Sequence, residues 1–250
     1  MTPILRTSAM PVCPPVSETR LYLRDWRAWL PGSTVATDPR IDASERPEAE
    51  HIPAMLRRRL TPLGRAVCVM LHALGSDAET LPVLHASRHG DGHRPLDMLD
   101  TIASGEGVSP ARFSLSVHNA IVGVHSIASG HHAPMAAIAA AGDEFAALLE
   151  ESLGYLADGQ SEVIAVFSDS PLPTRYRAAD IAPETPAAVA LRFSCRDGRQ
   201  LREQSADKQA MSETVTPPMV VDWLCQQRTS LTTHHPPRCW WLETPDLKSR

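Results

Sequence analysis

Histidines are the residues of this chain whose spacing first suggests chemistry, because neutral imidazoles are common metal ligands. His85, His89 and His93 recur every four residues, and two histidine doublets follow later in the chain. A spacing of four aligns ligands only on a helix. Two glycines interrupt this run, which favours a strand passing into a loop, and no His-Glu-x-x-His pattern occurs. We therefore expect loop and cap histidines, with no metal site and no cofactor.

Three side chains are candidate nucleophiles. Ser168 follows an apolar run, at a position where α/β enzymes often place catalytic groups, but it lies in no Gly-x-Ser-x-Gly elbow. The five cysteines, which include Cys68 and Cys195, are scattered and form no Cys-x-x-Cys pair. This pattern argues against a disulfide scaffold or a zinc ribbon.

Basic and glycine-rich motifs are few. The run Arg57-Arg58-Arg59 precedes an apolar helical pattern and fits either an anionic ligand site or a solvated basic face. The basic face is the commoner outcome of such a charge run. Gly90-Asp91-Gly92 lacks the strand-Gly-x-Gly-x-x-Gly-helix pattern of a dinucleotide site, so it indicates a turn.

Composition limits the class of protein. The 250 residues carry a formal net charge of −5, which argues against a nucleic-acid binder. The N-terminus has no basic region followed by an apolar run, and no stretch approaches the length of a membrane span. The sequence therefore predicts a cytoplasmic protein.

Apolar periodicity gives an alternation of strands and helices between two polar ends. Residues 1–18 are rich in Pro, Ser and Thr and predict a flexible N-terminus. Residues 19–243 predict a single domain, and residues 244–250 a tail. The predicted strands span 21–23, 81–87, 135–140, 163–167, 187–193 and 240–242, and the predicted helices 26–29, 64–74, 96–104, 119–128, 142–156 and 219–227, with a polar turn region at 195–205. This order favours an α/β sandwich with helices on both faces.

One stretch has a layout more specific than this alternation. A helix with Asn-x-x-x-Gly is followed by Gly-x-x-x-Pro, a short strand, a second helix closed by glycine and a buried strand; the marker residues are Asn119, Gly123, Gly130, Pro134, Gly142 and Gly159. This layout resembles the N-terminal half of a β-ketoacyl synthase of the thiolase superfamily. The resemblance implies a thiolase-like layered fold. Too few residues follow Ser170 for a complete second half, so the C-terminal part would be reduced.

The resemblance places the family's catalytic cysteine on Gly142. A condensing enzyme activates its thiol at a helix N-terminus, where the macrodipole and free N–H groups lower the thiol pKa. Gly142 has no side chain to acylate, and the neighbouring Asp143 and Glu144 add negative charge that disfavours a thiolate. The resemblance thus implies the scaffold of a condensing enzyme without its catalytic residue.

Two segments make the resemblance more specific, residues 86–91, Ala-Ser-Arg-His-Gly-Asp, and residues 109–120, which begin Ser-Pro-Ala-Arg-Phe and end His-Asn-Ala. They resemble short β-ketoacyl synthase-like proteins of aryl polyene and xanthomonadin-type pigment pathways, which are described as chain length factors. Such a protein forms a heterodimer with a full-length β-ketoacyl synthase. The partner condenses fatty-acid or polyketide-type chains on an acyl carrier protein, and the factor closes the end of its acyl tunnel.

The resemblance also implies where the partner binds. The strand at 135–140 would pair across the two-fold axis of the dimer, and side chains near Phe113 and Met135 are candidates for the tunnel wall. Ordinary core packing is the alternative role for both. The candidate interface and tunnel residues are Phe113, Asn119, Pro134, Met135, Ile138 and Ala140. Two other functions stay open, a divergent acyl-transfer or condensing enzyme that uses Cys68, Cys195 or Ser168, and a homodimeric acyl-chain-binding protein.

Overall fold

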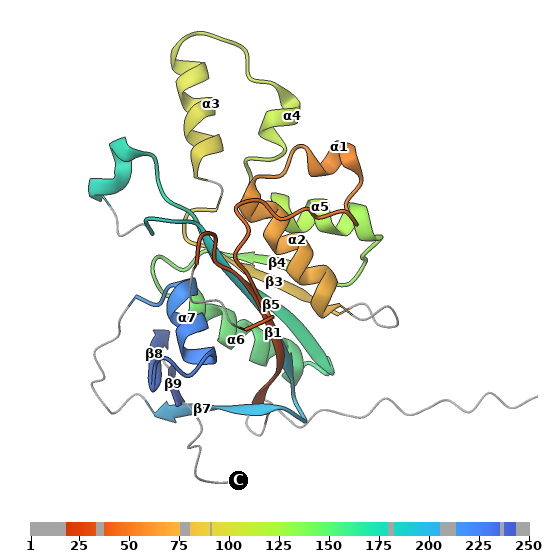
Figure 1. Ribbon diagram of the computed structural model, residues 1–250, viewed down its shortest axis with the longest axis vertical. Coiled ribbons are helices and arrows are strands. Elements are labelled where there is room, and N and C mark those ends of the chain that lie inside the picture. The colour runs from red at the N-terminus through yellow and green to blue at the C-terminus, as the bar shows by residue number, and fades with distance from the viewer. Residues whose placement is uncertain are drawn as a thin grey trace, which may run out of the picture.

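The computed structural model of the chain describes residues 19–33, 38–75, 81–90, 92–179, 183–205, 214–235 and 238–243. The predicted flexible N-terminus, 1–18, and the predicted tail, 244–250, lie outside the described residues. In chain order the elements are β1 (Leu21–Trp29), β2 (Ile41–Asp42), α1 (Ala54–Arg57), α2 (Pro62–Leu74), β3 (Val83–Ala86), α3 (His93–Ala103), α4 (Pro110–Phe113), α5 (Ala120–Ser129), β4 (Met135–Ile138), α6 (Glu144–Ala157), β5 (Glu162–Asp169), the short 3-10 helix η1 (Thr174–Ala179), β6 (Ala187–Ser194), β7 (Arg199–Ser205), α7 (Pro217–Leu224), β8 (Ser230–His235) and β9 (Arg238–Glu243) (Figure 1).

A mixed sheet forms the centre of the molecule. Its strand order is β4-β3-β5-β6-β1-β7-β9-β8, with β2 added beside β1. The first three strands in this order run parallel, and the pairs from β5–β6 through β8–β9 are antiparallel. Helical connections join the parallel strands, as parallel pairing requires. Strand β4 lies at one edge of the sheet, and in the described part of the chain it pairs only with β3.

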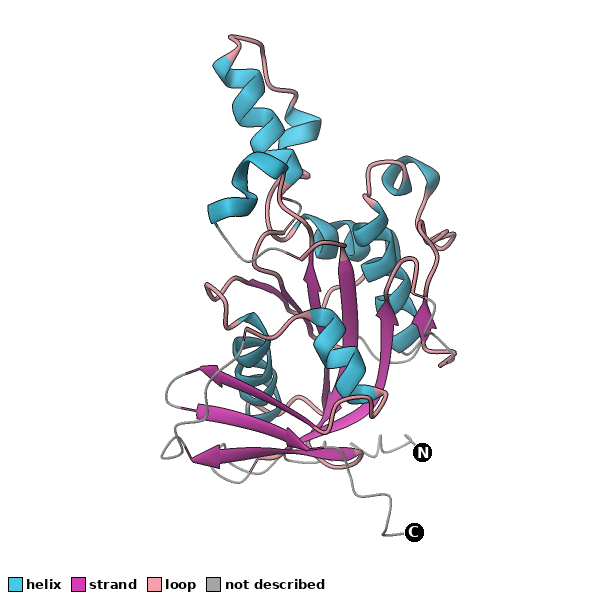
Figure 2. Cartoon of the chain, turned by 60° about the vertical axis from the view of Figure 1, so that its left-hand side comes forward, coloured by secondary structure: helices cyan, strands magenta, loops and turns pink. Residues whose placement is uncertain are grey.

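Helices cover both faces of the sheet, as the sequence predicts (Figures 1 and 2). On one face α2 packs against β1, β5 and β6, and α5 packs against α2. On the other face α6 packs against β3 and β5, and α7 packs against β6. The apolar positions of α6 that repeat at helical spacing are all buried, namely Phe145, Leu148, Leu149, Leu153 and Leu156.

The N-terminus of α2 is fixed by its own sequence. The Thr61 side chain accepts the backbone N–H of Gly64 at 3.2 Å, and Pro62 occupies the first helical position, where no N–H is needed. The helix predicted from residue 64 therefore begins two residues earlier.

Three local predictions were wrong. Residues 26–29, predicted as a helix, extend β1, because this strand pairs with β6 up to Trp29 and the ladder outweighs local propensity. Residues 199–205 of the predicted turn region form β7, a largely polar strand held between β1 and β9. The helical spacing of residues 119–128 also predicts that Ile127 lies on the buried side with Ala120, Val124 and Ala128, but Ile127 is 73% exposed. Strand β8 was not predicted at all.

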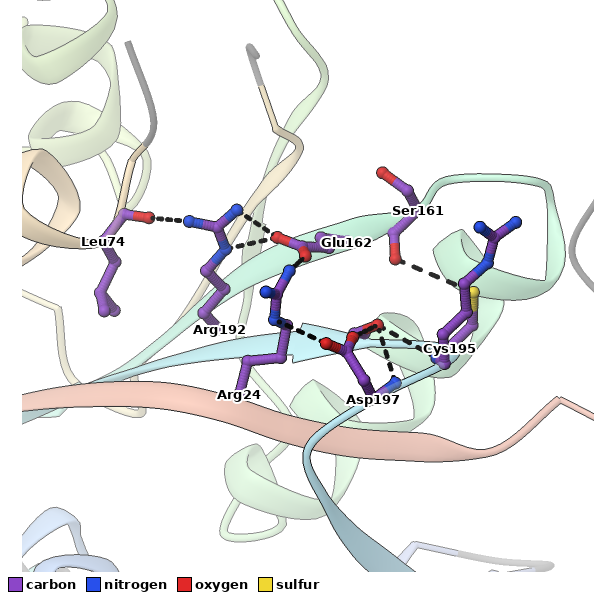
Figure 3. Close-up of polar contacts among 9 residues, drawn as sticks. Arg24, Leu74, Ser161, Glu162, Arg192, Cys195 and Asp197 are labelled. Carbon is purple, nitrogen blue, oxygen red and sulfur yellow. Dashed lines mark hydrogen bonds and ion pairs between the residues drawn. The ribbon is translucent and has the colours of Figure 1, made fainter. Parts of the chain in front are cut away.

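Charged residues cluster where β5 begins (Figure 3). Glu162 is only 6% exposed and accepts hydrogen bonds from the guanidinium groups of Arg24 on β1 and Arg192 on β6. Arg192 also donates to the carbonyl of Leu74 at 3.0 Å, and Arg24 Nε lies 3.5 Å from an Asp197 oxygen. These contacts join three strands and the end of α2, so we assign the cluster a structural role.

Candidate functional site

The carboxyl ends of β3 and β5 hold a group of polar side chains. Nε2 of His85, the third residue of β3, lies 2.8 Å from Oγ of Ser168 on β5. Beyond the end of β3, His89 Nδ1 lies 3.1 Å from an Asp169 oxygen. Burial raises the pKa of Asp169, whereas the neighbouring His89 acts to lower it. This end of adjacent parallel strands is where α/β proteins place ligand sites.

The histidine run is not brought together. His85 is buried inside a strand, His89 lies in a loop, and His93 opens α3. The part of the chain that the structure describes contains no group of three or more His, Cys, Asp or Glu side chains able to hold a metal ion. The prediction that the histidine run lies on a strand that passes into a loop is confirmed.

Gly142 lies in the turn between β4 and α6. Its φ is +115°, in a region that favours glycine, and the preceding Ala141 also has a positive φ, +52°. Helix α6 begins two residues later, at Glu144. The structure therefore places Gly142 beside a helix N-terminus, as the sequence pattern predicts.

The backbone N–H groups of this turn already have an acceptor. The Glu144 carboxylate, which is 3% exposed, lies 3.0 and 3.1 Å from Gly142 N and 3.2 Å from Ala140 N. A carboxylate is stabilised near a helix N-terminus. The electrostatic environment that would lower a thiol pKa here is used by a side chain of the same helix.

The Arg88 side chain lies close to Gly142. A Cβ atom built on Gly142 would lie 3.5 Å from Nη1 of Arg88, which comes from the loop after β3. This distance is ordinary van der Waals contact, so the positive φ is what disfavours a side chain at this position. The turn is thus shaped for a residue without a side chain.

The other candidate nucleophiles are buried. Cys68 has no exposed surface, and burial raises its thiol pKa to about 12, so it is not a thiolate near neutral pH. Cys195 is 8% exposed and its Sγ lies 3.8 Å from the Ser161 carbonyl, near the start of β5 and therefore at the opposite end of that strand from Ser168. Ser168 has a base beside it, His85, but both are buried, and burial lowers the pKa of His85 to about 3.

The predicted interface residues lie in two places. Pro134, Met135, Ile138 and Ala140 follow one another on or beside the edge strand β4. The residues of β4 itself are half-buried; Met135 packs against the core on the α2 face, and Ile138 packs against the core on the α6 face.

The remaining two candidates come from the segment between β3 and β4. Phe113 ends α4 and is 60% exposed, and Asn119 is the exposed N-cap residue of α5, without a side-chain cap bond. Figures 1 and 2 show α3 and α4 projecting from the rest of the molecule. Three other apolar side chains in this part of the molecule are also exposed, Leu99 and Ile102 on α3 and Val117 shortly after α4.

Two features of the site were missed from sequence. Arg88 was noted only as part of a motif, although its place directly after a buried strand was a usable signal. A cavity lined by Arg59, Arg94 and Arg112 was also missed, because these arginines come from three separate segments. Arg59 lies in the Arg57-Arg58-Arg59 run and Arg112 in the segment 109–120, but neither motif relates the two residues to each other.

No helix in the described ranges has both the length and the apolar character needed to cross a membrane. The predicted location in the cytoplasm stays a prediction.

One comparison with known proteins identifies a family. Residues 26–241 match the family described as beta-ketoacyl synthase, N-terminal domain. No curated protein matches the sequence significantly.

Solved structures show the same fold. One is a ketosynthase in complex with its chain length factor from Xenorhabdus doucetiae; the match has 24% identity and a TM-score of 0.72, and it covers 90% of this chain and 99% of that one. Another is the ishigamide ketosynthase/chain length factor, with 11% identity, a TM-score of 0.51, and coverage of 84% of this chain and 72% of that one.

Proposed function

The chain belongs to the β-ketoacyl synthase N-terminal domain family, with its thiolase-like layered fold, and on that premise we propose that it is a chain length factor. In this role it is a non-catalytic subunit that pairs with an active, full-length β-ketoacyl synthase and shapes the end of its acyl tunnel. The family resemblance predicted from the sequence is confirmed. The role as a subunit is the proposal.

The proposal rests on one observation, the residue and the backbone geometry at position 142. A condensing enzyme needs a nucleophile at this turn, and this chain has a glycine there with φ +115°. Glu144 accepts the backbone N–H groups of the turn, and the Arg88 guanidinium lies within van der Waals range of a Cβ at this position. Reversion to an active site would therefore require more than one substitution, which supports a role other than catalysis.

The edge strand β4 supports a partner that completes the sheet. Alternate residues of a parallel strand direct their backbone groups to the same neighbour. The carbonyls of Pro134 and Ile138 accept from Val83 and Ser87, so Met135 and Ala137 direct theirs away from β3. An uncovered edge is an open template for another strand. A strand of the synthase paired here across a two-fold axis would place Met135 near the shared tunnel.

The projecting segment supplies a second surface for the synthase. Leu99, Ile102, Phe113 and Val117 are each at least 44% exposed, and their exposure is reduced if a partner covers them. A large exposed apolar patch marks an interaction site. In the proposed complex Phe113 contributes to the tunnel wall, and the acyl carrier protein delivers chains to the synthase subunit.

The alternative of an independent acyl-transfer enzyme keeps one favourable observation, the hydrogen bond between Ser168 and His85. A hydroxyl paired with a neutral imidazole is the beginning of a nucleophile–base pair. Its burial opposes this role, because a substrate carbonyl must reach the hydroxyl.

Co-expression of the tagged chain with the ketosynthase from the same gene neighbourhood tests the proposal. We expect a one-to-one complex on size exclusion, and condensation products whose amount or length depends on this chain. Incubation of the chain alone with an acyl-carrier thioester should give no covalent adduct by intact mass spectrometry. A stable homodimer that ignores the synthase, or an adduct on Ser168, would contradict the proposal.

A further inference from the structure

A cavity of about 300 Å³ lies between the segment that leads into α2 and the projecting helices α3 and α4. It is lined by Arg59, Arg94, Met98, Ala111, Arg112 and Leu115. This volume is at the lower end of the range for small-molecule sites. The cavity lies apart from Gly142 and from strand β4, neither of which contributes to its lining.

Among the described residues, the charged side chains of the lining are all cationic. Arg94 donates to the Arg59 carbonyl, a contact that ties α3 to the segment before α2. Arg59 and Arg112 are exposed, and no ion pair of either is present among the described residues. The planar guanidinium fork matches a carboxylate or a phosphate, and such charge-assisted bonds are the strong ones.

The rest of the lining is apolar. Met98 is the one residue of α3 that is buried, although α3 lies on a projection with little core of its own. Leu115 is half-buried and Ala111 completes this side. A bare anion would leave these groups without a partner, whereas a short hydrocarbon or aryl group would cover them.

A narrower cavity of about 20 Å³ shares Arg59, Arg94 and Leu115 with the first and is also lined by His85, His118 and Ser168. This volume is enough for one water molecule. Nδ1 of His85 is buried and has no hydrogen-bond partner in the part of the chain that the structure describes. The narrow cavity therefore adds polar groups next to the apolar wall.

We propose that the larger cavity binds a small amphiphilic anion, a carboxylate or phosphate attached to a short apolar group, with Arg59 and Arg112 as its anion contacts. Met98 and Leu115 cover the apolar part. This site does not depend on the proposed pairing with a ketosynthase, since all of its groups belong to this chain.

The test is a ligand-observed NMR titration of the full chain, purified alone or with its synthase, at constant ionic strength. The probes are hexanoate, hexyl phosphate, inorganic phosphate and 1-hexanol. We expect saturable binding of a hexyl anion, weakened about tenfold by Arg59→Gln and by Arg112→Gln, the loss expected for one charge-assisted hydrogen bond. Comparing the affinities for hexanoate and for hexyl phosphate shows whether the site prefers a carboxylate or a phosphate.

Arg58→Gln is the matched control, because Arg58 is exposed, adjoins Arg59 and does not line the cavity. Circular dichroism melting confirms that each variant is folded. An equal loss of affinity in Arg58→Gln would overturn the proposal, as would hexanol binding as tightly as the anions. Inorganic phosphate binding as tightly as hexyl phosphate would show that the apolar wall is unused and would overturn it too. Co-purification with the synthase should be unchanged by Arg59→Gln. Failure of the proposed ligand site can therefore be distinguished from failure of the proposed pairing with a ketosynthase.

Discussion

Both carboxylate oxygens of Glu144 lie within hydrogen-bond distance of the backbone N–H of Gly142, at 3.0 and 3.1 Å. The two residues belong to the same turn, and their contact brings a negative charge to the N-terminus of α6. In a condensing enzyme this place stabilises a thiolate. Here the favourable position is filled from within the chain, which supports the proposed role without catalysis.

Gly142→Cys should therefore not restore a nucleophile. The substitution imposes a positive φ on a residue with a side chain, so we expect a destabilisation of about 1–3 kcal/mol. Incubation with an acyl-carrier thioester, followed by intact mass spectrometry, should show no acyl adduct on the variant.

Gly154→Cys is a matched control for that variant. Gly154 is exposed on the same helix, α6, and a Cβ there meets open space. Its urea midpoint should stay at or above that of the parent protein. Acylation of Gly142→Cys at a rate above that of Gly154→Cys would show that the turn retains activating power, against our interpretation.

Ala137→Pro should prevent assembly without unfolding the chain. The Ala137 N–H points away from β3, so proline removes no bond from the ladder within the chain and blocks only a strand added from outside. We expect co-purification with the ketosynthase to fall by about tenfold or more, the effect of losing at least one interstrand hydrogen bond and close strand contact.

Ala137→Ser keeps the N–H and serves as the control for that experiment. Thermal melting of both variants distinguishes lost pairing from lost folding. An intact complex with Ala137→Pro would remove β4 from the interface and leave the exposed side chains of α3 and α4 as the remaining candidate surface.

Glu162→Gln should destabilise the chain strongly. Glu162 is buried and accepts from both Arg24 and Arg192, so the amide leaves Arg192 without its carboxylate partner and Arg24 with its longer contact to Asp197. Removing one partner of a buried ion pair costs about 3–5 kcal/mol, and the 40% exposure of the Arg24 side chain places this case near the lower value.

The comparison for that variant is Asp100→Asn, which breaks the exposed pair between Asp100 and Arg175. Surface pairs contribute less than about 1 kcal/mol. Urea unfolding of both variants gives the two free energies of unfolding. Similar losses in the two variants would show that the Glu162 cluster is not structural.

The sequence predicted the elements around Gly142 well and the distal sheet poorly. The stretch from α5 to β5 carries strong apolar periodicity, and Phe145 to Leu156 leave little ambiguity. In strand β7, Leu201 is the one position described as buried, so the sequence of this strand shows no alternation of apolar and polar residues. Trp26 lies in a strand because of its pairing with Leu191, a contact 165 positions away that no local pattern reveals.

The candidate site was also only partly predictable, because relationships between neighbouring residues could be foreseen and contacts between distant segments could not. Gly142 and Glu144 are neighbours in sequence, so their charge relationship could be foreseen. Arg88 reaches Gly142 from the loop after β3, the strand beside β4, and the arginine cavity joins the segment before α2 to α3 and α4. Such groupings depend on tertiary structure.

Acid should destabilise the chain through its buried histidines. Burial lowers the pKa of His125 to about 4, with a further contribution from His131, and burial lowers that of His85 to about 3. The unfolded chain binds protons near pH 6.5, so the free energy of unfolding is highest above that pH and falls as pH drops toward 4. Each such histidine contributes up to about 1.4 kcal/mol per pH unit.

Urea unfolding at several pH values between 7 and 4.5 measures this slope. His125→Leu should reduce this slope by up to the equivalent of about one bound proton. In the parent protein only the unfolded chain protonates His125, and leucine cannot be protonated in either state. His132→Gln is the matched control at an exposed position, and its slope should equal that of the parent protein. If His125→Leu left the slope unchanged, His125 would have to be protonated in the folded chain, and its buried environment would not be the cause of acid sensitivity.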